Sequence, residues 1–259
     1  MSGLELFNNI ITVISFLANI VLILHYIKKA YIYYTDKRYL KKVLGFDDKT
    51  VLVTHSTFKF LTGQENVSSY ITYDSLRAIN KVIDMLNSQK IKFDLIGNKD
   101  SQNEVNIGGM LTNKRVGNYF RNHFKNFKYV ASKDREEIHR TYSIEQSIVE
   151  YSTGSTTGFK INGEMLPIDN STDYAFIIKL LPDDFQDEMK KTVHIIFGSK
   201  NIGTVKAAEY LATHYKQIYR KYKDKHYFFA IKVNCNNSSI NYAEGIKDFT
   251  NEMFIRKEK

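Results

Sequence analysis

The sequence predicts an α/β protein in which a single N-terminal transmembrane helix precedes a mainly parallel sheet with helices on both faces. Three observations predict this class: an apolar run without charges near the N-terminus, short β-branched segments that alternate with longer helical ones, and glycine turns that follow two of these segments. The 259 residues are 43% hydrophobic, which is enough for one large core behind the helix.

The first predicted element is a membrane-spanning helix within an N-terminal segment of residues 1–27. The run from Ile10 to Ile27 contains no Asp, Glu, Lys or Arg. As a helix it is about 27 Å long, close to the roughly 30 Å of a bilayer core. A basic, tyrosine-rich segment at 28–44 follows, and by the positive-inside rule this end is cytoplasmic. We therefore expect a single-pass protein of the inner (cytoplasmic) membrane with its C-terminal domain in the cytoplasm; the alternative is a buried N-terminal helix.

Polar residues recur on one face of the predicted membrane helix. Asn8, Thr12, Ser15 and Asn19 are spaced by four, three and four residues. Between membrane helices such side chains promote association, because each would otherwise lack a hydrogen-bond partner. We therefore expect Thr12, Ser15 and Asn19 to contribute to a homo-oligomer; the alternative is mild polarity that a lone helix tolerates.

The domain at 45–259 shows strands and helices in alternation, which predicts crossover connections and a parallel sheet. We expect strands at 50–54, 92–96, 104–107, 127–130, 174–180, 192–197 and 227–234. We expect helices at 73–88, 112–124 and 204–223. Residues 55–72 look like a long polar loop, and 131–172 interrupt the alternation. Two strands at 140–153 and 159–168 around the loop 152–158 predict a β-hairpin insertion there.

The strongest candidate ligand site is the turn in the segment HIIFGSKNIGT. Gly198 and Gly203 bracket this turn, Ser199 and Lys200 lie within it, and Thr204 can cap the helix that follows. Free backbone N–H groups, a helix dipole and glycines that permit close approach are the features of an anion site. The alternative is a tight strand-to-helix turn with ordinary capping.

Two further loops are expected to open on the same edge of the sheet. In one, Gly108 and Gly109 end a strand, and Thr112 or Asn113 caps the next helix. In the other, His55, Ser56 and Thr57 follow the first strand. Ligands of parallel sheets bind beyond the carboxyl ends of the strands, so we interpret the three loops together as a site for a phosphorylated, nucleotide-like small molecule. For the glycine turns a purely structural role is the alternative, and for the segment after the first strand it is a disordered lid.

Other functional classes find little support in the composition. The single cysteine, Cys235, excludes an intramolecular disulfide and a thiolate zinc site, and we expect neither a metal nor a cofactor. Of the net charge of +9, more than half lies just behind the anchor, so no sequence-specific nucleic-acid binding is expected. No catalytic motif is present, and an enzyme would need a cleft carboxylate. The available candidates are Asp74, Asp94, Glu104 and Asp173.

The overall plan resembles the membrane-helix effectors of prokaryotic antiviral defence, in which a Rossmann-like, CARF-like domain senses a nucleotide signal. The resemblance rests on the helix at 10–27, the opening strand VLVTHST, and the turns GGMLTN and GSKNIGT. It implies a symmetric oligomer, ligand binding near Ser56, Thr112 and Gly203, and disruption of the membrane when the ligand binds. A membrane-tethered enzyme acting on nucleotides or NAD, and a scaffold without ligand, remain the alternatives.

Overall fold

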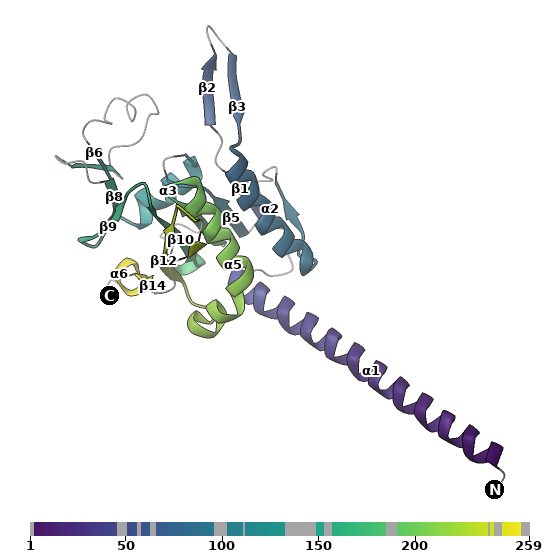
Figure 1. The fold of residues 1–259 in the computed structure, drawn as a ribbon. Helices are drawn as coiled ribbons and strands as arrows, with labels where there is room; N and C mark the ends of the chain where they lie inside the picture. The colour runs from purple at the N-terminus through teal and green to yellow at the C-terminus, as the bar shows by residue number, and fades with distance from the viewer. Residues whose placement is uncertain are drawn as a thin grey trace.

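A long helix and an α/β globular part make up the protein. The computed structural model describes residues 3–45, 51–55, 58–62, 66–95, 103–110, 112–132, 149–152, 157–184, 191–237, 239–240 and 245–254. Helix α1 (Gly3–Leu44) is continuous over 42 residues and projects from the globular part as a rod (Figure 1). It contains an 18-residue window with mean hydropathy 1.9 that is not buried, so this helix is apolar enough to cross a membrane.

The main sheet is mixed, whereas the sequence predicted a mainly parallel one. It contains β1 (Val51–His55), β4 (Phe93–Asp94), β5 (Asn103–Ile107), β10 (Thr172–Leu180), β11 (Thr192–Gly198), β12 (Tyr227–Asn234), β13 (Ser239–Ile240) and β14 (Ile246–Asp248). The strand order is β13-β12-β10-β11-β5-β1-β4, and β14 also pairs with β12. Strands β4, β1, β5 and β11 are parallel, but β10 is antiparallel to both of its neighbours. The reason is that the chain enters β10 from a second sheet rather than from a crossover helix.

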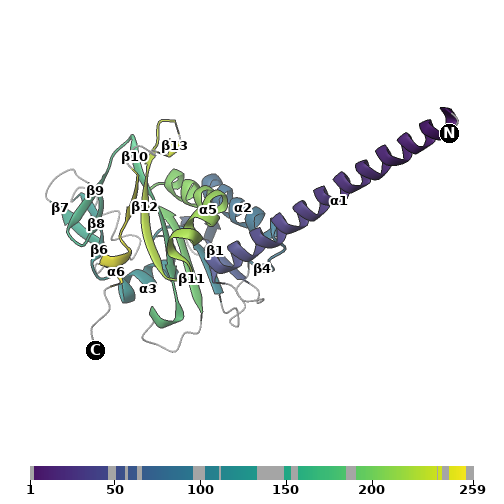
Figure 2. The ribbon, with the colours of Figure 1, turned by 90° about the horizontal axis from the view of Figure 1, so that it is seen from below.

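Both faces of the main sheet are covered (Figure 2). Helices α2 (Tyr73–Ser88) and α5 (Asn201–Tyr222) pack with the end of α1 on one face, in one hydrophobic cluster. Helices α3 (Lys114–His123) and α6 (Thr250–Met253) cover the other face, in a cluster rich in phenylalanine. The alternating inward and outward side chains of the buried strands supply both clusters, as expected for a sheet between two layers.

The predicted insertion is a small four-stranded sheet rather than one hairpin. Its strands are β6 (Phe127–Ser132), β7 (Val149–Ser152), β8 (Thr157–Ile161) and β9 (Glu164–Ile168), in the order β7-β6-β8-β9. The hairpin joins β8 to β9 through Asn162 and Gly163, which both have positive φ, the geometry that an Asn-Gly turn favours. Among the residues that the structure describes, β7 pairs with β6 and not with β8, so the hairpin expected around 152–158 is not found there.

The segment expected as a polar loop at 55–72 also contains strands. β2 (Phe58–Thr62) and β3 (Asn66–Tyr70) form an antiparallel ribbon. In Figure 1 this ribbon projects away from the main sheet. The sequence predicted a loop because polar residues outnumber apolar ones between His55 and Thr72.

The last turn of α1 is part of the core. Leu40, Val43 and Leu44 are at most 1% exposed. The buried ammonium of Lys179 donates to the carbonyl of Lys42 at 3.0 Å, and burial lowers the pKa of Lys179 to about 8. Along α5, the charged pair of Asp36 and Lys216 lies at 2.6 Å. The rod and the globular part are thus joined through packed side chains as well as through the backbone.

Candidate functional site

A cavity of about 470 Å³ lies at the carboxyl edge of the parallel strands. It is formed where β5 and β11 end and where α2 and α5 begin. The residues that line it are Thr72, Ser75, Gly108, Gly109, Met110, Thr112, Tyr129, Phe159, Phe197, Gly198, Ser199, Lys200, Asn201 and Thr204. The strand β1 has β4 on one side and β5 on the other, so this edge is also where the strand order reverses, which is the usual place of a ligand in such sheets.

The structure brings together most of the residues that the sequence singled out. The lining includes Gly108, Gly109 and Thr112 from one turn, and four residues from the other: Gly198, Ser199, Lys200 and Thr204. Asn113 lies behind the cavity, where its side chain accepts the N–H groups of Arg115 and Val116 and so caps α3. His55 ends β1, half-buried and outside the lining. Ser56 and Thr57 lie outside the described residues.

The N-terminus of α5 already holds an anion from the protein itself. The carboxylate of Asp173, at the start of β10, is fully buried and accepts the N–H groups of Ser199, Lys200 and Gly203 at 2.9–3.1 Å. Burial raises the pKa of Asp173 to about 6, although these hydrogen bonds act in the opposite direction. Three amides that the sequence analysis assigned to a ligand therefore serve an internal carboxylate.

The two glycines of this turn are required by close packing. A Cβ on Gly203 would collide with the Asp173 carboxylate, and a Cβ on Gly198 would lie 2.6 Å from the Gly203 Cα. Thr204 does not cap α5, contrary to the expectation. The helix begins at Asn201 with Lys200 as the capping residue, and the Thr204 hydroxyl instead accepts the N–H of Gly198 at 3.0 Å. This bond holds the end of β11 against the first turn of α5.

The remaining wall comes from parts of the chain that the sequence analysis did not connect with the site. Thr72 caps α2 by accepting the N–H of Ser75, and both residues line the cavity. Tyr129 and Phe159, from the small sheet, pack at 5.6 Å between ring centroids and form an aromatic wall. Thr72, followed by the acidic Asp74 at the start of an apolar-periodic segment, was a readable signal for the cap. No signal in the sequence indicated the aromatic wall, because its position depends on how the small sheet packs against the main sheet.

Lys200 contributes to the lining, but its ammonium is engaged away from the α5 amides. Its Nζ donates to the carbonyl of Asp169 and lies 3.7 Å from the Sγ of Cys235. Desolvation raises the pKa of the Cys235 thiol above its usual value, despite this neighbouring cation. The lysine therefore stabilises the loop before β10 and gives the rim of the cavity a positive charge.

A polar network crosses the buried side of β5 at the opposite edge of the sheet. The Glu104 carboxylate lies 2.6 Å from both Arg115 and Lys191 and accepts the Tyr119 hydroxyl at 2.9 Å. Burial alone would raise the pKa of Glu104, but the bonds and charges of these partners outweigh it and lower the pKa. His194 is a fully buried core histidine, and burial holds its pKa well below the usual value.

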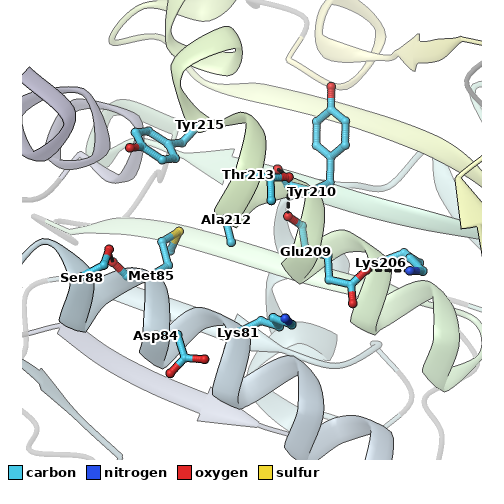
Figure 3. Close-up of a pocket in the computed structure, with 10 residues that line it drawn as sticks. All are labelled: Lys81, Asp84, Met85, Ser88, Lys206, Glu209, Tyr210, Ala212, Thr213 and Tyr215. Atoms are coloured by element: carbon cyan, nitrogen blue, oxygen red, sulfur yellow. Dashed lines mark hydrogen bonds and ion pairs between the residues drawn. The ribbon is translucent and has the colours of Figure 1, made fainter. Parts of the chain in front are cut away.

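A second cavity, of about 500 Å³, lies between α2 and α5 (Figure 3). Met85, Ala212 and Tyr215 face it from the two helices, while Lys206 and Glu209 pair at 2.6 Å along its side. It lies along the middle of two helices, away from the strand ends, and contains neither a glycine turn nor a helix start. We therefore take the cavity at the strand ends as the candidate site.

Neither cavity suggests a metal centre. Within the part of the chain that the structure describes, no group of three or more His, Cys, Asp or Glu side chains could hold a metal ion. The four carboxylates that an enzyme might use, Asp74, Asp94, Glu104 and Asp173, are not among the residues that line the candidate site. No protein-family model, curated protein or solved structure matches this chain.

Proposed function

We propose that this chain is a membrane-anchored sensor whose globular part binds a nucleotide-like phosphorylated ligand and acts through the transmembrane helix. The observation that carries the proposal is the cavity at the carboxyl edge of β5 and β11, where two glycine turns and the starts of α2 and α5 meet. Its volume of about 470 Å³ is within the range of small-molecule sites.

The walls of the cavity suit the two halves of a nucleotide. The half-buried Tyr129 offers a ring face on which a base can stack, and the buried Phe159 packs against it. The opposite wall consists of glycine turns and helix starts, where backbone N–H groups favour phosphate. Asp173 engages two of the four amides at the start of α5, those of Lys200 and Gly203, and makes no bond to Asn201 or Ile202. A phosphate therefore has the latter two amides, the start of α2 and the charge of Lys200 as its expected partners.

Helix α5 connects the site with the anchor. Its first turn carries Lys200, Asn201 and Thr204 at the cavity. Its last turns contact α1, where Tyr219 packs against Tyr39 at 5.3 Å and accepts a hydrogen bond from Lys42. At about 1.5 Å per residue the 22-residue helix spans about 33 Å. A ligand that prefers one position of α5 would thereby shift the population of α1 arrangements.

The output step is the repacking of membrane helices. Thr12, Ser15 and Asn19 are exposed on α1, so they are accessible to a second copy of the helix. We propose a homo-oligomer in the inner membrane, with the globular part in the cytoplasm and ligand-driven disruption of the bilayer as an antiviral defence. The basic segment behind the apolar run supports this orientation.

The deciding experiment uses the full-length protein in liposomes. Thermal unfolding is followed against cyclic and linear oligonucleotides, NAD and its fragments, with ligand integrity checked by mass. A ligand at about 100 times its Kd should stabilise the protein by roughly 2.7 kcal/mol. Tyr129→Leu should weaken binding about fivefold or more, because base stacking contributes about 1–3 kcal/mol, whereas Tyr34→Leu, the same change on α1, should not.

The output is tested on the same liposomes by dye release. Replacing Ser15 and Asn19 by Leu should abolish ligand-induced release but leave the thermal shift intact, since these residues are far from the cavity. Val13→Leu with Val21→Leu is the matched control for added apolar volume. No shift with any ligand would refute the sensor and leave a scaffold; a consumed ligand would instead show an enzyme. A shift without release would mean that the helix only tethers.

A further inference from the structure

A collar of basic side chains surrounds α1 where it leaves the globular part. The helix itself carries Lys28, Lys29, Lys37, Arg38, Lys41 and Lys42 in this region. The fold adds lysines from two distant turns. The ammonium of Lys90, after α2, lies 5.9 Å from the ring centroid of Tyr33, and that of Lys223, after α5, lies 5.6 Å from the ring centroid of Tyr219.

These two turn lysines occupy positions where glycine is usual. Lys90 has φ +52° and Lys223 has φ +56°, a region that residues with a Cβ rarely adopt. Lys90 follows α2 in a turn where the N–H of Ile91 bonds to the carbonyl of Leu86, the arrangement that favours glycine at helix ends. Strained backbone of this kind persists where the residue serves another purpose, and both side chains are exposed beside α1.

Lys28, Lys29 and Lys90 lie at the height of the lipid headgroups, whereas Lys223 lies beside Lys42, about 22 Å beyond Ile27 along the helix. If the apolar run ends its bilayer span at Ile27, Tyr33 lies about 9 Å further along the helix. The headgroup layer is about 5–8 Å thick on each side of the hydrocarbon core. Lysine side chains at the level of Tyr33 therefore reach the phosphates, and the exposed rings of Tyr31 and Tyr34 lie at the same depth, where tyrosine is favoured.

We propose that the membrane-facing part of this collar, Lys28, Lys29 and Lys90, is a docking surface for anionic phospholipid headgroups. Its charge is complementary to an anionic leaflet, and the membrane helix passes through its centre, so the surface has one natural occupant. The acidic residues nearby, Asp36 and Asp224, are fewer than the cations and pair with Lys216 and Lys42. Docking would set the distance of the globular part from the bilayer. This proposal rests on the membrane insertion of α1 proposed above.

The test compares spin-labelled phosphatidylglycerol with spin-labelled phosphatidylcholine around the full-length protein in mixed bilayers. The motionally restricted component of the electron spin resonance spectrum gives their relative association. We expect phosphatidylglycerol to be favoured severalfold, and less so at high salt. Replacing Lys90 by glycine (K90G) should lower the preference at least twofold, since each basic residue near an anionic surface contributes about fivefold at its own site. The same change at Lys223 (K223G), which lies further from the bilayer, should leave the preference at the parent's.

Glycine relieves the positive φ, so K90G and K223G should melt no lower than the parent, and a lost preference will not reflect unfolding. A further control is K114Q, which removes the same charge near α3, and its preference should stay at the parent's. An unchanged preference in K90G, or an equal loss in either control, would overturn the collar. Absence of any restricted lipid component would refute membrane insertion itself, which is a separate failure.

Discussion

The Oδ2 of Asp173 lies 3.1 Å from the backbone nitrogen of Gly203, although 29 residues separate them in the chain. The carboxylate therefore acts as an internal anion at the start of α5, where the sequence predicted an external one. It also joins β10 to the helix that runs from the candidate site to α1. The position of α5 relative to the sheet thus depends on one buried charge.

Gly203→Ala should destabilise the protein by about 2 kcal/mol, within the usual range for overpacking a core. The new Cβ would collide with the Asp173 carboxylate and the Tyr174 carbonyl, both held by the sheet. Gly109→Ala is the matched control, because its Cβ would meet its nearest atom at an ordinary 3.6 Å. Denaturant unfolding of both variants checks this, and equal stability would show that Gly203 is not a packing requirement.

The stability of the protein should fall between about pH 4 and pH 6 because of Asp173. Burial raises its pKa to about 6, above the ordinary 3.8, so the folded protein holds this proton more tightly than the unfolded chain. The resulting stabilisation is complete below pH 3.8 and is lost as the pH rises through 6. Asp173→Asn should lack this dependence. Melting curves of both proteins across this window test it, and parallel pH profiles would contradict the assignment.

Glu104 should produce the opposite pH dependence. Its pKa is lowered by Lys191, Tyr119 and Arg115 in spite of burial, so its contribution is present above about pH 4.5 and is lost on acidification. Glu104→Gln should destabilise the protein at pH 7 by about 2 kcal/mol, the scale of a hydrogen bond to a charged group. Glu164→Gln removes a half-exposed ion pair with Lys247 and should change stability by less than about 1 kcal/mol. Chemical denaturation at pH 7 compares the two, and equal losses would rule out a special role for Glu104.

The globular part should need the end of α1 in order to fold. A fragment of residues 35–259 keeps Leu40, Val43 and Leu44, each at most 1% exposed, whereas 46–259 lacks them. Burial of each side chain contributes about 1.5–3 kcal/mol, so their sum is comparable with the whole stability of a domain. Circular dichroism and size-exclusion chromatography should show a cooperative fold only for 35–259. A folded fragment 46–259 would mean that the helix end is dispensable.

The regular elements with a strong local pattern were predictable. Helix α2 spans Tyr73–Ser88 as its periodicity indicated, and its buried face includes Ala78, Val82 and Leu86. The hairpin at Asn162-Gly163 was also predictable in principle, since Asn-Gly between apolar runs is a strong turn signal. The stretch of Ser, Thr and Gly at 152–158 is typical of a longer loop, and it therefore predicted the turn at the wrong place.

The sequence by itself determined the features that neighbouring residues specify: the apolar helix, its basic end, the buried strands and the glycine turns that line one cavity. Tertiary structure alone decided the rest. It placed Asp173 against the α5 amides, Tyr129 and Phe159 against the glycine turns, and Lys90 beside α1. The physical reason is the distance along the chain over which each interaction acts. Propensity and hydrophobic period act over a few residues, whereas a cap, a cavity wall or a charge cluster depends on which strands become neighbours in the sheet.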